Sequence, residues 1–213
     1  MSDCTSRIEP AVSVRVRPNR RQLFEIASEQ GGYFTTEQAR ARGYSFALLS
    51  HHVKTGRFLR VRRGLYRLDE YPSSPREDVV AAWLASGKDG TVVSHESALD
   101  LLGLSDVIPD AVHLTVPRSR RNLPSLPGVN IHTTSREVRP IDRVVRGGVA
   151  VTSATRTILD AAEAGTAPEQ IEMAVRQAVE RGLALPDQLL QGAAERSRRV
   201  AALIKGALYA VPA

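Results

Sequence analysis

The chain of 213 residues is long enough to form one large domain or two small ones, each with a buried core. It is 42% hydrophobic and 24% charged, and no apolar run approaches the length of about 18 residues that would suggest a membrane helix. The start, MSDCTSRIEP, lacks the pattern of a secretory signal, and a single cysteine excludes a disulfide framework and a thiolate metal cluster. We therefore expect a protein of the bacterial cytoplasm with no membrane partner.

The positive charge is concentrated at the N-terminal end. Residues 1–71 contain 13 Lys and Arg against 7 Asp and Glu, whereas residues 72–213 contain 16 of each. Such segregation is typical of a nucleic-acid-binding module. The alternative is a small helical domain whose arginines are merely solvated.

Residues 1–18 show no clear periodicity and are interpreted as a basic arm, which either enters a DNA minor groove or is a disordered tail. Asn19 is a plausible N-cap for a helix that extends to Gln30 and ends at Gly31-Gly32. The apolar face predicted for this helix comprises Leu23, Phe24, Ile26 and Ala27.

Two short helices follow. Thr35 or Thr36 can cap the first, from Glu37 to Arg42, and Gly43 ends it. Ser45 caps the second, which spans about three turns. Helical spacing divides this second helix into two faces: an inner face of Leu49, His52 and Val53, and an open face of Phe46, Ala47, Ser50, His51 and Lys54.

After Gly56 the periodicity changes to that of strands. Leu59 and Val61 alternate with Arg60 and Arg62, Arg63-Gly64 forms a turn, and the chain returns through residues 65–68. This order of elements predicts a winged helix-turn-helix over residues 19–71, with Tyr33 and Phe34 pairing beside the wing or packing into the core.

We expect the second helix to lie in the major groove and the hairpin to contact flanking phosphates. One copy would give weak specificity, so a paired site on an inverted repeat of double-stranded operator DNA is expected. The candidate DNA-binding residues are Arg15, Arg17, Arg20, Arg21, Thr36, Ser45, Phe46, Ala47, Ser50, His51, Lys54, Arg57, Arg60, Arg62 and Arg63.

Residues 69–75, DEYPSSP, mark a domain boundary. Beyond it, residues 76–213 predict a mixed α/β domain that ends in helices, so the fold class of the chain is α+β. In this domain the only tryptophan, Trp83, is expected in the core, Ser94 is expected to cap the helix HESALDLLGL, and Arg156 can pair with Asp160.

The sequence contains no GxxxxGK[ST], GxGxxG, GxSxG or HExxH motif. His95 and Glu96 are adjacent and could both be metal ligands. Because no second histidine follows at helical spacing, we favour the interpretation that they form the capped, hydrogen-bonded start of a helix. A folded site could gather His113 or His132 with Asp110 or Glu137, yet the spacing does not indicate it. We therefore predict no catalytic residue, no metal and no cofactor.

The run TTEQARARGY…GRFLRVRRGLYRL resembles the N-terminal winged helix of the AbiEi antitoxin family. The run SHESALDLLGL…VHLTVP…GVNIHTT…VTSATRTILDAA resembles the domain that follows it in many of those proteins. The resemblance covers roughly residues 20–165 and implies a repressor of its own operon that is also the antidote to a nucleotidyltransferase-like toxin. Some proteins of this kind continue into a nuclease-like extension at the C-terminus. The helical C-terminus of this chain lacks the carboxylate pattern of such an extension, so we do not predict nuclease activity for it.

Two other hypotheses remain open at this point. The first is a stand-alone or ligand-responsive transcriptional repressor. The second is a DNA-processing protein in which the winged helix delivers a catalytic C-terminal domain to DNA.

Overall fold

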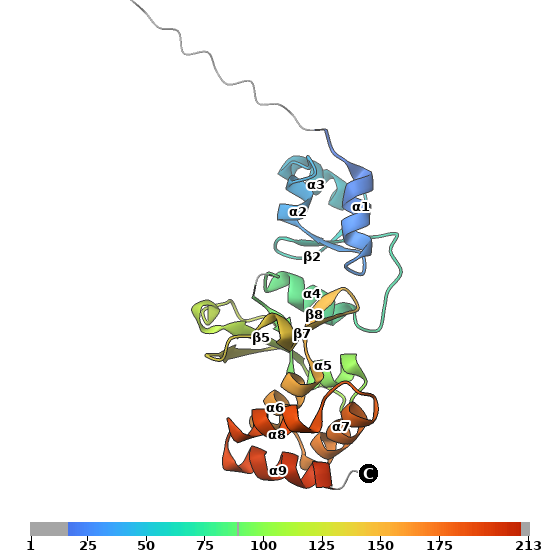
Figure 1. Ribbon diagram of the computed structural model, residues 1–213. Coiled ribbons are helices and arrows are strands. Elements are labelled where there is room, and N and C mark those ends of the chain that lie inside the picture. The colour runs from blue at the N-terminus through green and yellow to red at the C-terminus, as the bar shows by residue number, and fades with distance from the viewer. Residues whose placement is uncertain (1–16, 89, 210–213) are drawn as a thin grey trace, which may run out of the picture.

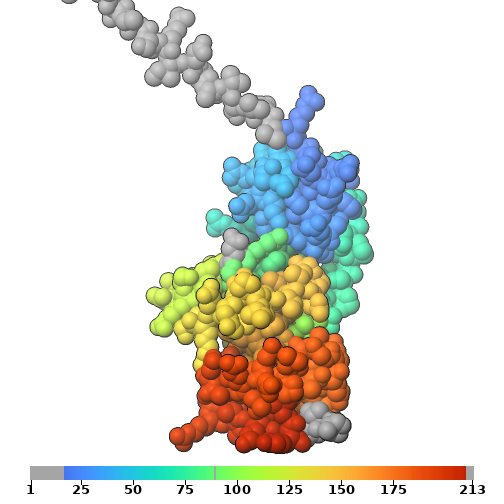
Figure 2. All heavy atoms as spheres, viewed as in Figure 1, coloured from blue at the N-terminus to red at the C-terminus, as the bar shows by residue number. Residues whose placement is uncertain are grey.

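The computed structural model describes residues 17–88 and 90–209. Figures 1 and 2 show an elongated molecule with the N-terminal unit at one end, a sheet in the middle and the last helices at the other end. The predicted α+β fold class, with a winged helix followed by a mixed α/β domain that ends in helices, is confirmed.

The N-terminal unit has the element order of a winged helix. Its sheet is antiparallel, with strand order β1-β3-β2, so the first strand pairs with the returning strand of the hairpin as predicted. The elements are α1 (Arg20–Ser28), β1 (Tyr33–Thr35), α2 (Thr36–Arg40), α3 (Phe46–Lys54), β2 (Phe58–Arg62) and β3 (Leu65–Leu68).

Local sequence signals explain where the first two helices begin. Asn19 Oδ1 accepts a hydrogen bond from the backbone N–H of Gln22 at 3.0 Å, which caps α1. Thr35 caps α2 in a capping box, in which Thr35 Oγ1 accepts from the N–H of Gln38 and the Gln38 side chain accepts from the N–H of Thr35. The cap is therefore Thr35 and not Thr36, and the helix ends at Arg40, two residues earlier than expected.

Aromatic side chains form the centre of the N-terminal core. Phe34 is fully buried, with its ring centroid 4.9 Å from that of Phe58 and 5.7 Å from that of Tyr66. Leu23 of α1 and Leu49 of α3 pack in the same cluster. This packing attaches both helices to the sheet.

The second face of the same sheet is also covered. Tyr33 and Leu65 belong to the buried cluster of the C-terminal part, where helix α4 (Glu77–Ala85) packs against β1 and β3. An ion pair of 3.4 Å joins Arg67 of β3 to Glu77 of α4. The predicted domain boundary within residues 69–75 stays a prediction, because the two buried clusters meet across this sheet.

The remaining elements form a five-stranded sheet and a group of helices. The sheet has the order β6-β5-β4-β8-β7; the pairs β5-β6 and β4-β8 are parallel, and the pairs β4-β5 and β7-β8 are antiparallel. The elements are β4 (Val92–Val93), α5 (His95–Leu102), β5 (Val112–Pro117), β6 (Val129–Thr134), β7 (Arg143–Arg146), β8 (Val149–Thr152), α6 (Ala154–Ala164), α7 (Pro168–Glu180), α8 (Pro186–Ala194) and α9 (Arg198–Tyr209), with short 3-10 turns at Arg118–Arg120 and Pro140–Asp142.

Helix α4 lies between the two sheets, while α5 and α6 lie on the opposite side of the five-stranded sheet and α7 to α9 continue away from it (Figure 1). Trp83 of α4 is buried, as predicted, and its indole N–H donates to the carbonyl oxygen of Thr91 at 2.8 Å. The predicted pair of Arg156 and Asp160 is also confirmed, with 2.7 Å between Nε and Oδ2. Arg196 of the C-terminal helices completes this buried group at 2.5 Å from Asp160 Oδ1.

The turn between β7 and β8 touches the end of α1. A Cβ atom at Gly148 would overlap the carbonyl oxygen of Glu29, and the φ angle of Gly148 is +79°. Both observations require glycine at this position. Lys88 also donates a hydrogen bond to Gln30 across the same junction.

Two expectations about side chains, at Phe24 and at Ser94, were wrong. Phe24 is 44% exposed, because α1 presents Leu23 and Ala27 to the core instead. Leu59 and Val61 are exposed, because Phe58 is the residue of β2 that reaches the core. Ser94 precedes α5 but makes no side-chain cap.

Among the described residues, no helix combines the length and the apolar character needed to cross a membrane.

The two phenylalanines of the first 34 residues provide a matched test of the fold. Phe34→Ala is expected to reduce the free energy of unfolding by about 3–5 kcal/mol, because it removes a fully buried ring from a packed aromatic group. Phe24→Ala should cost less than about 1 kcal/mol, since that ring is partly in solvent. Urea denaturation measures both values, and equal losses would contradict the assigned core.

Candidate nucleic-acid interface

Helix α3 is positioned by its ends. Ser45 Oγ accepts a hydrogen bond from the N–H of Leu48 at 3.2 Å, which confirms the predicted cap. The hydroxyl of Thr55 donates to the carbonyl oxygen of His51 at 3.0 Å at the other end. Gly43, with φ +85°, allows the tight turn that separates α2 from α3. The two helices are thus held in the relative orientation of a helix-turn-helix.

The inner face of α3 is the one predicted. Leu49 is buried, and Val53 packs against the same cluster. The His52 ring lies 4.8 Å from the Phe58 ring and 5.9 Å from the Tyr44 ring. Burial lowers the pKa of His52, and the charge of Arg57 lowers it further. His52 is therefore a half-buried aromatic side chain that packs against the edge of the core.

The outer face of α3 has no packing role. All five residues predicted for this open face are exposed: Phe46, Ala47, Ser50, His51 and Lys54. Phe46 is 64% exposed, and the guanidinium carbon of Arg40 lies 5.1 Å from its ring centroid. An exposed aromatic ring costs free energy in water unless a partner covers it, and thymine methyl groups are one suitable partner.

The wing presents charge beside this helix. Arg57, Arg60 and Arg63 are exposed, as expected of phosphate contacts. The backbone N–H of Thr36, at the start of α2, donates to the carbonyl oxygen of Gly64 at 2.8 Å. This bond ties the turn of the hairpin to the helix-turn-helix, so the wing and α3 form one continuous unit. The half-buried Thr36 side chain lies beside Gly64 rather than on the open face.

Arg62 differs from the other arginines of the wing. It is half-buried, and its guanidinium Nη2 donates to the carbonyl oxygen of Pro127 at 3.4 Å. Pro127 belongs to the loop before β6, so Arg62 joins the wing to the C-terminal part. The predicted contact of Arg62 with DNA stays a prediction, and its substitution would also disturb this junction.

The N-terminal arginines are mostly open to solvent. Arg17 is exposed, whereas Arg15 lies outside the described residues. Arg20 is 3.3 Å from Glu70, and Arg21 is 2.9 Å from Glu25. Exposed ion pairs of this kind contribute about 0–1 kcal/mol, so both arginines can exchange their carboxylates for DNA phosphates at little cost.

The winged unit matches a known protein family. Residues 21–68 match the family described as "Transcriptional regulator, AbiEi antitoxin". The match is confined to the N-terminal unit. The AbiEi match covers α1 to β3, which are the elements that build the candidate interface, and it confirms the resemblance of the winged unit. The resemblance read beyond residue 68 stays a prediction. The matched family is one of regulators rather than enzymes.

The crystal structure of the RV2827C protein from Mycobacterium tuberculosis is similar over a much longer stretch. The comparison covers 95% of this chain and 79% of that chain, with a TM-score of 0.60 and 16% sequence identity. At this identity the likeness concerns the fold alone, and it includes the C-terminal part that the AbiEi match does not reach. No curated protein matches the sequence.

Arg40 is a residue of this surface that was not among the candidates. It lies in the last turn of α2, and its side chain is brought over Phe46 by the turn at Gly43. A helix-turn-helix places the end of its first helix beside the start of its second, so this geometry was accessible from the predicted motif.

Single substitutions on the open face of α3 test its role. Ser50→Ala and His51→Ala are each expected to weaken operator binding by about 5- to 150-fold, which corresponds to about 1–3 kcal/mol for one missing base contact. Binding to unrelated duplex DNA should change little, because phosphate contacts are retained. Fluorescence anisotropy with both duplexes measures the ratio, and equal losses on both would exclude base readout by these residues.

Proposed function

We propose that the protein is the antitoxin of a type IV toxin-antitoxin system, which binds operator DNA through its winged helix and represses its own operon. The observation that carries the proposal is the open face of α3, which is free of core contacts and flanked by the exposed Arg60 and Arg63 of the wing. At this place Phe46 is 64% exposed, with the Arg40 guanidinium beside its ring.

The mode of binding follows from the shape of the unit. Helix α3 enters the major groove, Arg57, Arg60 and Arg63 contact flanking phosphates, and the arm with Arg17 continues along the backbone or into the minor groove. The side chains of α3 are mostly small or apolar, so contacts with thymine methyl groups and DNA shape contribute alongside a few hydrogen bonds. Two copies on an inverted repeat supply the remaining specificity.

The C-terminal part serves as the antidote. Residues 72–213 carry equal numbers of basic and acidic side chains, so this part gains little from DNA phosphates. A surface that acts on a protein, or that protects the cell by another route, needs no net charge. The partner implied by the AbiEi resemblance is a nucleotidyltransferase-like toxin, counteracted in the cytoplasm without catalysis by this chain.

The contribution of the wing is tested by salt dependence. Arg60→Ala combined with Arg63→Ala is expected to lower affinity for the operator and to flatten the slope of log affinity against log salt by about 1.8, or about 0.9 for each phosphate that is no longer neutralised. Titrations between 50 and 200 mM salt are suitable, because a protein with many phosphate contacts loses affinity by about 10³- to 10⁵-fold over this range of salt concentration.

A matched control removes the same charge elsewhere. Arg176 of α7 and Arg198 of α9 are exposed, and replacing both by Ala changes the net charge equally. This control should keep the wild-type slope. A wing variant that also keeps the wild-type slope would show that the hairpin does not contact phosphates.

The division of labour between the two parts is tested in cells. Arg60→Ala with Arg63→Ala should release promoter repression while leaving protection from the cognate toxin intact, because the exposed wing arginines have no part in the C-terminal surface. Growth and promoter activity are scored in one strain, with toxin supplied from an independent promoter. Loss of protection at an unchanged protein level would tie neutralisation to DNA binding.

A ligand-responsive repressor is the second candidate. The observation that favours it is a polar cavity of about 460 Å³ in the C-terminal part, lined by residues that include His95, His132 and Asp160. The neighbouring gene distinguishes the two functions. A nucleotidyltransferase reading frame directly downstream favours the antitoxin, whereas an unrelated metabolic operon favours the repressor.

A further inference from the structure

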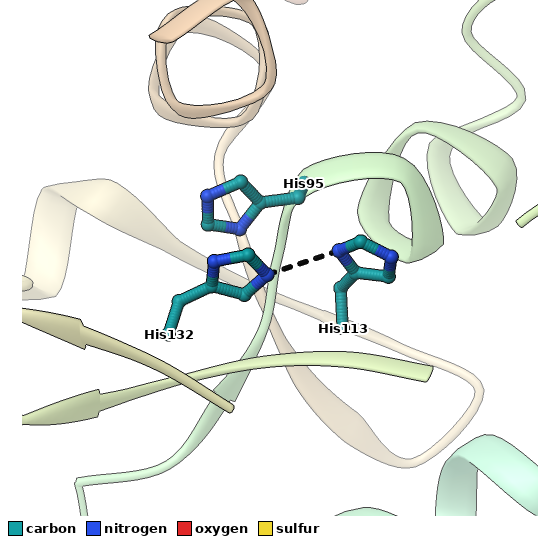
Figure 3. Close-up of side chains that lie close together, drawn as sticks. All are labelled: His95, His113 and His132. Carbon is teal, nitrogen blue, oxygen red and sulfur yellow. Dashed lines mark hydrogen bonds between the residues drawn. The ribbon is translucent and has the colours of Figure 1, made fainter. Parts of the chain in front are cut away.

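Three histidines from separate elements meet on the side of the five-stranded sheet that faces α5 and α6. His95 is the first residue of α5, His113 lies in β5 and His132 lies in β6 (Figure 3). One ring nitrogen of each lies within 4.8 Å of the others. Parallel pairing aligns His113 with Asn130 and Thr115 with His132, which places both strand histidines on the same face of the sheet. No such grouping was expected from the spacing of these residues in the sequence.

We propose that His95, His113 and His132 form a binding site for a divalent transition-metal ion of the Zn²⁺ type. Imidazole nitrogens are preferred ligands of Zn²⁺, Ni²⁺ and Cu²⁺, and three protein ligands with an open fourth position are a common zinc arrangement. The site lies in the C-terminal part, away from α3 and the wing, so its test does not depend on the DNA-binding proposal.

The distances suit a single ion. His113 Nδ1 and His132 Nε2 are 3.0 Å apart, and two nitrogens at zinc bond lengths of 2.0–2.1 Å in a tetrahedron are separated by about 3.3 Å. The His95 ring is stacked on the His132 ring, with 3.7 Å between the centroids. The lone pairs of stacked rings lie in nearly parallel planes, so the His95 ring must rotate before its nitrogen points at the same ion.

An outer contact orients the His95 ring. For His113, the second nitrogen Nε2 lies 3.8 Å from Asp110 Oδ1, which is too long for a hydrogen bond, and 3.5 Å from Asn130 Nδ2. His95 Nδ1 is 2.8 Å from Ser94 Oγ, and a proton held there leaves Nε2 for the metal. The pair of His95 and Ser94 follows the arrangement of a ligating histidine whose second nitrogen is held by an oxygen.

The surroundings favour neutral imidazoles. His95 is 7% exposed, and burial lowers its pKa to about 3, with the neighbouring His132 as the next cause. Burial also lowers the pKa of His132, and the charge of His113 adds to the effect. The backbone of His95 has φ +52°, an uncommon conformation outside glycine, which costs about 1–3 kcal/mol and often marks a functional position.

Two of the three histidines line a cavity. His95 and His132 line the space of about 460 Å³, whose wall also includes Asp160, Glu163 and Arg136. Asp160 is already engaged by Arg156 and Arg196, so its charge is balanced. Water or a small anion that enters this cavity would therefore complete the coordination of the ion.

Metal uptake by the tag-free, full-length protein tests the proposal. After treatment with a chelator and dialysis, the protein should bind one Co²⁺ per chain with the visible absorption of a tetrahedral complex, and Zn²⁺ should displace it. Zn²⁺ at about 100 times its Kd should raise the Tm by about 5–10 °C. His113→Ala and His132→Ala should each weaken uptake by more than about 100-fold, beyond the cost of losing an outer partner.

The chain offers a matched control, because its other two histidines, His51 and His52, are in α3. His51→Ala should leave Co²⁺ uptake unchanged. Uptake that is absent from the wild type, or that persists in both His113→Ala and His132→Ala, would overturn the proposal.

A measurement on the wild-type protein covers the case in which these variants do not fold. NMR of ¹⁵N-labelled imidazoles should show that Zn²⁺ shifts the ring nitrogens of His95, His113 and His132. Shifts confined to His51 and His52 would place any bound ion on α3 and exclude the proposed site.

Discussion

The three-stranded sheet β1-β3-β2 holds the molecule together because two of its strands, β1 and β3, bury side chains on both faces. Phe34 and Tyr66 face the helices of the winged unit, while Tyr33 and Leu65 face α4. Alternation of side chains along a strand lets neighbouring residues serve opposite cores. The orientation of α3 and the wing is therefore set by the same strands that bind the C-terminal part, and the ion pair of Arg67 with Glu77 and the contact of Arg62 with Pro127 reinforce that junction. A DNA-reading surface built on such a sheet has a defined position relative to the rest of the chain.

The C-terminal part is organised around a different constraint, which is the burial of charge. Asp160 is nearly inaccessible and accepts from Arg156 on its own helix and from Arg196 at the C-terminal helices. A buried carboxylate without partners is costly, so these arginines hold α6 and the end of the helical group together. The cavity beside them opens toward the histidines of the sheet. The buried charged group and the histidines therefore line the same cavity, and a ligand in it would contact both the sheet and the helices.

Local signals in the sequence were sufficient to predict the winged unit. Ser45 caps α3, Gly43 permits the turn before it, and helical periodicity separates Leu49 from Ser50 and His51. Each of these effects acts over a few residues and can be read without tertiary structure. Leu59 and Val61 alternate with arginines in the sequence, but this strand at the edge of the sheet buries only Phe58, the residue that meets Phe34. The histidine group could not be predicted, since it depends on the pairing of β5 with β6 and on the placement of α5 against them. The same holds for Arg62, whose partner Pro127 is 65 residues away in the chain.

The central claim is that DNA is read by the open face of α3 together with the wing. Hydrogen-deuterium exchange of the full chain with a duplex from its own promoter tests this claim directly, because exchange reports on every segment at once. We expect slower exchange on DNA binding at residues 45–55 and at the β2-β3 turn, with residues 92–209 unchanged apart from the loop at Pro127. Protection confined to the five-stranded sheet or to helices α6–α9, with none at α3, would contradict it.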